Sequence, residues 1–155
     1  MSQSLSQLYV HIVFHINCND AVIIPEKLQN NLHAYIAAIC KNQDSSSIIV
    51  GGIDDHVHLL CRLSKNITAA KLLEEIKANS SKWIKTQADE FGSRLNKFSW
   101  QKGYGIFSVS LSKIDNVKQY ISNQKEHHKK ISFKDEYILL LKKHNVEYDE
   151  QYLWN

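Results

Sequence analysis

The sequence predicts an α+β fold of the ferredoxin-like type, an antiparallel sheet in β-α-β-β-α-β order with two helices on one face. Apolar residues alternate with polar ones along four short segments, and they recur at helical spacing along two segments between them. Two further helices follow, and the first of them carries Tyr120. A chain of 155 residues is the size of one domain with a sizeable core, so we expect a single domain over residues 1–155.

Each element has its own sequence signal. Pro25 is typical of the first turn of a helix, and Thr68 can cap the start of another. The capping signal Ser-x-x-Asp begins at Ser112 and again at Ser132. The first expected elements are a strand at 7–16, a helix from 25 to about 41, strands at 48–53 and 56–63 joined by a turn at 54–55, and a helix from 68 through 84. A basic loop at 92–103 and a strand at 104–111 follow. The last elements are a helix from 112 to about 129, a helix from 132, and an irregular, aromatic-rich C-terminus from 146.

The composition excludes several classes of protein. Hydrophobic residues make up 43% and charged residues 23%, as in ordinary globular chains, and five glycines with one proline argue against disorder, collagen-like sequence and a turn-rich sandwich. Cys18, Cys40 and Cys61 lack C-x-x-C spacing, which favours buried thiols in a reducing compartment. Residues 1–7 do not resemble a signal peptide, and no apolar run is long enough to span a membrane, so we expect a cytoplasmic location.

A pair of histidines on the third predicted strand is the first candidate site. His56 and His58 are two residues apart, so they project from the same face of the strand, away from the predicted helices. Two imidazoles placed in this way can grip one metal ion. The alternative is a pair of ordinary surface or half-buried histidines, because a His-x-His pair is weak support by itself. His11 and His15 share one face of the first strand, where filling of a polar face is the simpler interpretation.

Tyr120 and Gln124 form the second candidate site. They lie one turn apart on the helix after the fourth predicted strand, so their side chains are neighbours. A tyrosine hydroxyl has a pKa of about 10 and is a poor nucleophile at neutral pH unless a basic neighbour or a metal ion assists it. A carboxamide one turn away can lend an oxygen to the same metal. Such pairs are common on helices, so the spacing alone does not establish a site.

The third feature is a concentration of positive charge. The whole chain carries +3, yet residues 93–134 carry +7, from nine cations against Asp115 and Glu126. Aromatic side chains are interleaved with these cations, and this combination suits the phosphates and unpaired bases of a nucleic-acid strand. A solvated lysine-rich face is the alternative. The candidate DNA-binding residues are Arg62, Arg94, Lys97, Lys102, Lys125, Lys129 and Lys130.

Four segments, in this order and spacing, resemble one known family. Asp55-His56-Val57-His58-Leu59-Leu60 resembles the histidine-hydrophobe-histidine (HUH) motif of single-tyrosine transposases of the insertion-sequence 200/605 group, and Tyr120-Ile-Ser-Asn-Gln124 resembles their nucleophile segment. Trp100 to Ser110 resembles the segment before their last strand, and the tail from His127 to Trp154 resembles the REP-associated tyrosine transposase subgroup. Asp54 stands where many members have a proline, which should alter the turn and not the ligands.

The resemblance implies a DNA transposase. By this resemblance, Tyr120 would be the nucleophile that attacks a phosphodiester of single-stranded DNA. The attack would form a 5′-phosphotyrosine link and release a 3′-hydroxyl for strand transfer. His56, His58 and Gln124 would hold a divalent ion, Mg²⁺ or Mn²⁺, that polarises the phosphate. The resemblance also implies recognition of DNA hairpins, and a homodimer in which the tyrosine helix can complete the partner subunit's metal site.

Two other functions remain open from the sequence. The chain could be a catalytically inactive or domesticated protein that binds single-stranded or hairpin DNA, although all four site residues are intact. It could also be a metal-binding regulatory protein without a nucleic-acid role. No Walker loop, G-x-G-x-x-G, G-x-S-x-G, H-E-x-x-H or C-x-x-C motif occurs, which removes the commonest nucleotide-binding, hydrolase and zinc-protease interpretations. For His127 and His128, contact with phosphate or solvent is a simpler interpretation than contact with metal.

Overall fold

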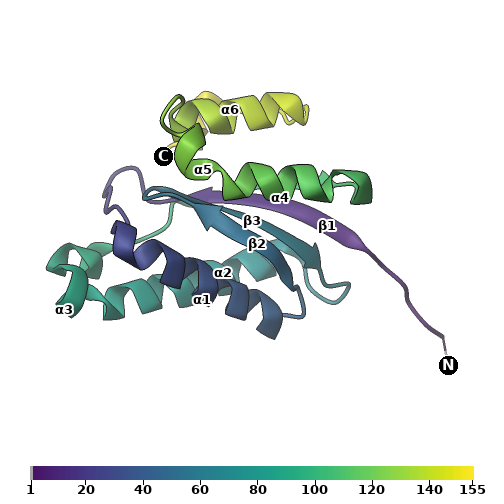
Figure 1. Cartoon of the computed structure of the whole chain (residues 1–155), viewed down its shortest axis with the longest axis horizontal. Coiled ribbons are helices and arrows are strands. Elements are labelled where there is room, and N and C mark those ends of the chain that lie inside the picture. The colour runs from purple at the N-terminus through teal and green to yellow at the C-terminus, as the bar shows by residue number, and fades with distance from the viewer. Residues whose placement is uncertain (1) are drawn as a thin grey trace.

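The fold consists of one antiparallel sheet between two layers of helices (Figure 1). It is taken from a computed structural model that describes residues 2–155. Over these residues the four strands are β1 (Leu8–His15), β2 (Ser47–Gly52), β3 (His56–Leu63) and β4 (Gly105–Val109), in the order β2-β3-β1-β4. The pairings are antiparallel and the element order is that of the ferredoxin-like unit, so the predicted fold class is confirmed.

Helices cover both faces of the sheet (Figure 1). The layer below the sheet in this view contains α1 (Glu26–Asn42), α2 (Ala69–Thr86) and α3 (Ala88–Phe91), followed in the chain by the 3₁₀ helix η1 (Ser93–Lys97). The layer above it contains α4 (Ile114–Ser122), α5 (Gln124–His127) and α6 (Phe133–Lys143); the 3₁₀ helix η2 (Leu111–Lys113) precedes them and α7 (Glu150–Leu153) follows. Across residues 2–155, no helix has both the length and the apolar content that crossing a membrane requires.

Strand alternation gives the sheet two different faces. Ile12 and Phe14 of β1 and Leu59 of β3 point towards α1 and α2, where they are fully buried in the main core. The intervening residues point the other way, and the register sets His15 opposite His56 on this second face. The predicted orientation of the HUH strand is therefore confirmed.

A second, smaller core holds α6 against the histidine face. It is made of the buried side chains of Val13, Phe107, Phe133, Tyr137, Leu140 and Leu141, with the half-buried Leu153 and Trp154 packed against it. The apolar positions of α6 recur every three or four residues, so one stripe of the helix faces the sheet. This packing turns a polar sheet face into a closed interior.

Local details differ from the prediction near the tyrosine helix. Ser112 is not a helix cap: it lies within η2, and its hydroxyl contacts that of Ser110 at 3.2 Å. The single helix expected to reach residue 129 is interrupted at Asn123, which separates α4 from α5. Thr68 and Ser132 do cap their helices, because each side-chain oxygen accepts a hydrogen bond from a backbone N–H three residues later. The C-terminus, expected to be irregular, contains α7.

Gly51 on β2 lets the tyrosine helix approach the sheet closely. A Cβ atom at this position would lie 2.8 Å from both Cγ2 and the backbone oxygen of Ile121. Ile121 directly follows Tyr120 and is buried. The missing side chain therefore determines how close α4, and with it Tyr120, lies to β2.

Candidate metal and tyrosine site

The two sequence-predicted sites meet in one place. β3 directs His56 and His58 into the space under α4 and α6, and both side chains are fully buried. The end of α4 and the start of α5 bring Tyr120 and Gln124 to the same space. Oε1 of Gln124 lies 2.8 Å from Nε2 of His56, and the rings of Tyr120 and His58 are 5.7 Å apart between centroids. A single chain thus contains all four residues in contact.

Glu136 of α6 lies at the centre of this group and was not predicted. It is 2% exposed, and its Oε1 atom lies 3.0 Å from Nε2 of His58. Its Oε2 atom accepts hydrogen bonds from the hydroxyl of Tyr120 and, at 3.1 Å, from Nε2 of Gln124. The carboxylate therefore links the histidine strand to the tyrosine helix.

A sequence signal for Glu136 does exist. It lies three residues after Phe133 and four before Leu140, which are both buried, so it falls on the apolar stripe of α6. A lone carboxylate on a buried stripe needs a buried partner, because an unpaired buried charge is costly. The partners lie on β3 and α4, more than ten residues away in sequence, so no local sequence pattern identifies them.

His128 also belongs to the group, which corrects the expectation that it contacts phosphate or solvent. Its side chain is 5% exposed, and its Nε2 atom lies 2.9 Å from Oε1 of Gln124 and 3.2 Å from Oε1 of Glu136. The adjacent His127 is 30% exposed, and its Nε2 atom lies 3.1 Å from Oε2 of Glu136 without hydrogen-bond geometry. The residues whose ligand atoms lie close enough together to hold a metal ion are His56, His58, His128 and Glu136.

A second set of contacts orients the imidazole rings. Nδ1 of His56 donates to Oδ1 of Asp55 at 2.6 Å, and Nδ1 of His58 lies 2.8 Å from Nε2 of His11. His11 therefore supports the site, beyond the filling of a polar face expected from the sequence. His15 does not reach the group, and its Nδ1 atom donates to the backbone oxygen of Ile16 at 3.0 Å. Such outer contacts fix which ring nitrogen faces a metal.

Burial and hydrogen bonding determine the charges in the site. Burial lowers the pKa of His58 to about 4 and that of His11 to about 3, so both are neutral at pH 7. Burial opposes ionisation of Glu136, but hydrogen bonds from His58 and Tyr120 outweigh it and hold its pKa well below the ordinary value. Burial and the Glu136 carboxylate raise the pKa of Tyr120 well above the ordinary value. Imidazole nitrogens around a carboxylate and an amide oxygen form a donor set that suits a divalent cation.

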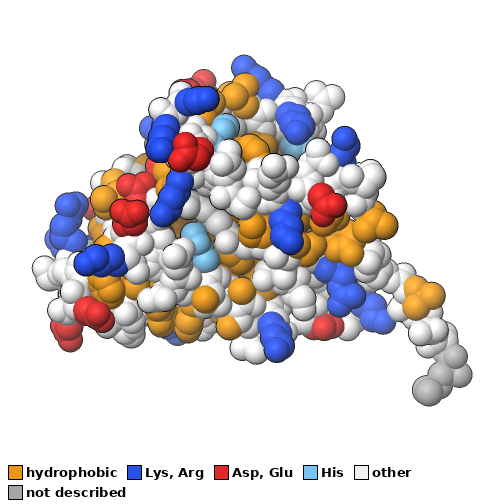
Figure 2. Space-filling view, viewed as in Figure 1, with side chains coloured by type: hydrophobic (Ala, Val, Ile, Leu, Met, Phe, Trp, Pro, Cys, Tyr) orange, Lys and Arg blue, Asp and Glu red, His pale blue; other side chains and the backbone are white. Residues whose placement is uncertain are grey.

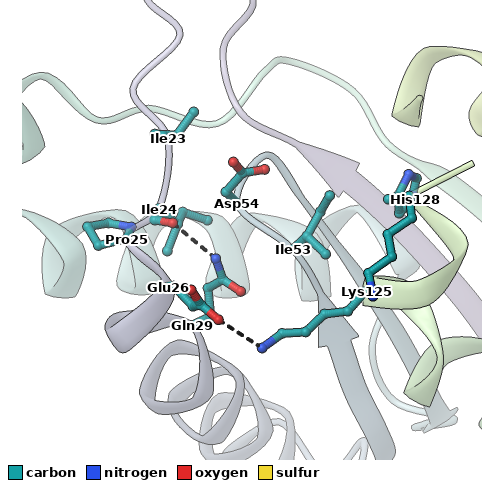
Figure 3. Close-up of a pocket in the computed structure, with 10 residues that line it drawn as sticks. Ile23, Ile24, Pro25, Glu26, Gln29, Ile53, Asp54, Lys125 and His128 are labelled. Carbon is teal, nitrogen blue, oxygen red and sulfur yellow. Dashed lines mark hydrogen bonds and ion pairs between the residues drawn. The ribbon is translucent and has the colours of Figure 1, made fainter. Parts of the chain in front are cut away.

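Pockets open around the group, and Tyr120 lines two of them, one together with His127 and one, of about 640 Å³, together with His11. The pocket beside the tyrosine has a volume of about 480 Å³ and is lined by Asn116, Gln119, Tyr120, Ser122, Asn123 and His127. A pocket of about 420 Å³ opens beside His128, between the start of α1 and α5 (Figure 3). In this second pocket Ile23, Ile24 and Ile53 supply apolar wall, and Lys125 reaches across to Glu26, with 3.5 Å between Nζ and Oε1.

The structure gathers only some of the candidate DNA-binding residues near this site. Lys125 and Lys129 line the pocket beside His128, and Lys130 follows them in the chain. Figure 2 shows Lys and Arg side chains around the region of α5, together with acidic ones. The other candidates lie elsewhere: Arg62 near the far end of β3, Arg94 and Lys97 on η1, which packs against α2, and Lys102 in the loop before β4.

The fold and a family comparison define this chain as a transposase. Residues 4–124 match the sequence model of the family described as transposase IS200-like. Because the match spans more than half of the chain, the chain belongs to the IS200-like transposase family. The family expected from the motifs is thereby confirmed. The matched residues include His56, His58, Tyr120 and Gln124, and they end before His128 and Glu136.

Two transposases are among the solved structures that resemble this one. A candidate transposase from Deinococcus radiodurans R1 aligns with a TM-score of 0.59 and 17% sequence identity over 80% of this chain and 98% of that chain, a likeness that shows the fold. The REP-associated tyrosine transposase bound to a REP hairpin aligns with a TM-score of 0.47 and 10% identity over 80% of this chain and 70% of that chain. A search of curated proteins finds no match.

Proposed function

We propose that this transposase cleaves and rejoins single-stranded DNA through a covalent link to Tyr120. The observation that carries the proposal is the position of the Tyr120 hydroxyl. It donates a hydrogen bond to one oxygen of Glu136, and the other oxygen of that carboxylate lies 3.0 Å from His58 Nε2. The phenol is therefore next to a carboxylate that can accept its proton and to candidate metal ligands, and a metal ion bound there would offset the raised pKa of Tyr120.

In the proposed step, Oη of Tyr120 forms a bond to phosphorus, and the bond from phosphorus to the 3′ oxygen of the preceding nucleotide breaks. The hydroxyl proton passes to Oε2 of Glu136, to which it is already hydrogen-bonded. The departing 3′ oxygen takes a proton from water. The products are a 5′-phosphotyrosine and a free 3′-hydroxyl, and attack by a 3′-hydroxyl on the phosphotyrosine at a new junction completes strand transfer.

The residues proposed as ligands fit a divalent cation. His56 and His58 offer imidazole nitrogens and Gln124 an amide oxygen, and these atoms suit borderline or hard divalent ions. Mg²⁺ or Mn²⁺ bound there would draw charge from the phosphate oxygens and make phosphorus a better electrophile. The protein contributes the orientation of the rings, since Asp55 accepts the hydrogen bond from Nδ1 of His56 and leaves Nε2 directed inwards.

The route of the DNA is part of the proposal. The DNA strand would approach Tyr120 through the pocket that Tyr120 lines together with His127. Lys125 and Lys129 would contact phosphates in the pocket beside His128. The side chains of His56 and Glu136 are buried between the sheet and α6, so binding of the scissile phosphate would require α6 to move outwards. Hairpin recognition and a homodimer belong to the proposal through the motif resemblance, and the cytoplasmic location expected from the sequence is proposed with them.

Formation of a covalent adduct tests this function. The protein is incubated with a single-stranded oligonucleotide that carries a hairpin, in the presence of Mn²⁺, and resolved on a denaturing gel. We expect an adduct with the wild type, its loss in Tyr120→Phe, and its retention in Tyr152→Phe, which changes a tyrosine that is 70% exposed. An adduct that survives Tyr120→Phe would assign the nucleophile to another residue.

Further variants separate this function from DNA binding alone. His56→Ala should abolish adduct formation through loss of a metal ligand, and a chelator should do the same. Cleavage that is insensitive to the chelator would remove the metal from the mechanism. Hairpin binding without an adduct in any divalent metal would instead indicate a DNA-binding protein that has lost turnover.

A further inference from the structure

Two side chains from beyond the family-matched residues enter the site. His128 follows α5, Glu136 lies on α6, and the family match ends at residue 124. Nε2 of His128 lies 2.9 Å from the Gln124 amide oxygen and 3.2 Å from Oε1 of Glu136. Together with the ring nitrogens of His56 and His58, the ligand atoms of these two residues lie within 4.8 Å of one another.

The hydrogen bonds of one ring nitrogen show which nitrogen of His56 and of His128 faces the centre of the group. Nδ1 of His56 donates to Asp55 at 2.6 Å, and Nδ1 of His128 donates to the backbone oxygen of Ile131 at 2.8 Å. The form of an imidazole that binds a metal ion is the neutral one, and with its hydrogen on Nδ1 it has a lone pair and no hydrogen on Nε2. Both Nε2 atoms nevertheless face Oε1 of Gln124, at 2.8 and 2.9 Å.

Gln124 and Glu136 do not supply the missing hydrogen. Nε2 of Gln124 donates to Oε2 of Glu136 at 3.1 Å, so the amide oxygen is the atom that faces the two imidazoles. An ionised carboxylate can only accept hydrogen bonds. A metal ion held by both Nε2 atoms, the amide oxygen and the carboxylate would satisfy all of them at once, and a bound ion is a recognised reason for such a buried cluster.

We propose that His128 and Glu136 are metal ligands alongside His56, His58 and Gln124, and that the site therefore selects a divalent transition cation such as Mn²⁺ over Mg²⁺. Three imidazole nitrogens favour transition cations, whereas Mg²⁺ prefers oxygen ligands and retains several waters. The inference deepens the proposed function and rests on it for the use of the metal in DNA cleavage, but not for metal binding itself.

Metal binding can be measured on the full chain without DNA. Protein freed of metal is titrated with Mn²⁺ and separately with Mg²⁺ by calorimetry, and free Mn²⁺ is counted by its electron paramagnetic resonance signal. We expect Mn²⁺ to bind more tightly than Mg²⁺.

His128→Ala and Glu136→Gln should each weaken Mn²⁺ binding on the order of 10- to 100-fold. Glu126→Gln is the matched control, because this carboxylate is 65% exposed and pairs with Lys129 at 2.8 Å, so Mn²⁺ affinity should not change.

A measurement on the wild type guards against misfolding of the variants. X-ray absorption of the Mn²⁺-bound wild type should give three imidazole ligands, and two would exclude His128. Unchanged Mn²⁺ affinity in both ligand variants, with loss in His56→Ala, would overturn the inference and leave cleavage by Tyr120 standing. Equal affinity of the wild type for Mg²⁺ and Mn²⁺ would overturn it as well. Intact Mn²⁺ selectivity without any DNA adduct would support the inference and reject the proposed function alone.

Discussion

The hydroxyl of Tyr120 donates its hydrogen bond to Oε2 of Glu136, a residue on a different helix. Burial and this carboxylate raise the pKa of Tyr120, so the residue is a neutral phenol at pH 7. Burial opposes ionisation of Glu136, but hydrogen bonds from His58 and Tyr120 outweigh it and keep the pKa of Glu136 low. The proton of the phenol is thus directed at an ionised base before any substrate binds.

Glu136→Gln should slow formation of the Tyr120 adduct by about 100-fold or more, because a carboxamide can accept the hydrogen bond but not the proton. The rate is measured in a single turnover on hairpin DNA at saturating Mn²⁺, so that weaker metal binding does not contribute. Glu126→Gln is the control, since Glu126 is exposed and pairs with Lys129 at 2.8 Å. Equal rates in wild type and Glu136→Gln would rule out Glu136 as the proton acceptor.

Phe133 should anchor α6 over the site. It is buried, and its ring stacks on that of His56 with 4.3 Å between centroids. Phe133→Ala should lower the free energy of unfolding by about 3–5 kcal/mol in a urea titration, as expected for a buried aromatic side chain. Leu139→Ala, on the same helix but 56% exposed, should change it by less than about 0.5 kcal/mol. Similar effects from the two substitutions would mean that α6 is not packed on the histidine face.

Cys61 on β3 gives a prediction of pH dependence. Burial raises the pKa of its thiol from 9.0 to about 12. The folded state keeps the Cys61 proton at pH values where the unfolded chain has lost it. The contribution of the protonated thiol to the free energy of unfolding is therefore complete below pH 9 and is lost as the pH rises towards 12. Relative to Cys61→Ala, the unfolding free energy of the wild type should fall by up to roughly 1.4 kcal/mol per pH unit in this range. A difference that stays constant with pH would show that the thiol is not shielded in the folded protein.

The sheet and the orientation of its histidines were predictable because both depend on local alternation. In β3 the apolar Val57 and Leu59 flank His58. Because Val57 and Leu59 pack against α1 and α2, His58 must face the opposite side of the sheet. Helical spacing predicted that Gln124 lies near Tyr120, and both side chains do contact Glu136, although the helix is interrupted at Asn123 between them.

The meeting of strand, tyrosine helix and α6 was not predictable, because it depends on tertiary packing. Gly51 allows the close approach of α4, yet a glycine in a strand does not identify the helix that will lie over it. His128 lies four residues after Gln124 and contacts it at 2.9 Å, as helical spacing allows, but that spacing does not show that either side chain reaches the histidine strand. Glu136 enters the site only because α6 packs on the second core.

Assembly of the site within one chain leads to a last prediction. Gln124 contacts His56 of its own chain at 2.8 Å, and Tyr120 contacts Glu136 of its own chain. If the protein forms the expected homodimer, co-expression of Tyr120→Phe with His56→Ala produces dimers in which no subunit has both residues intact. We expect no adduct on the denaturing gel, because an intact Tyr120 would then always lie beside a damaged histidine pair. Wild type co-expressed with Tyr120→Phe should give an adduct in proportion to the wild-type chain, which controls for expression and mixing. An adduct from the two variants together, above the level of either alone, would mean that Tyr120 serves the partner subunit's histidines.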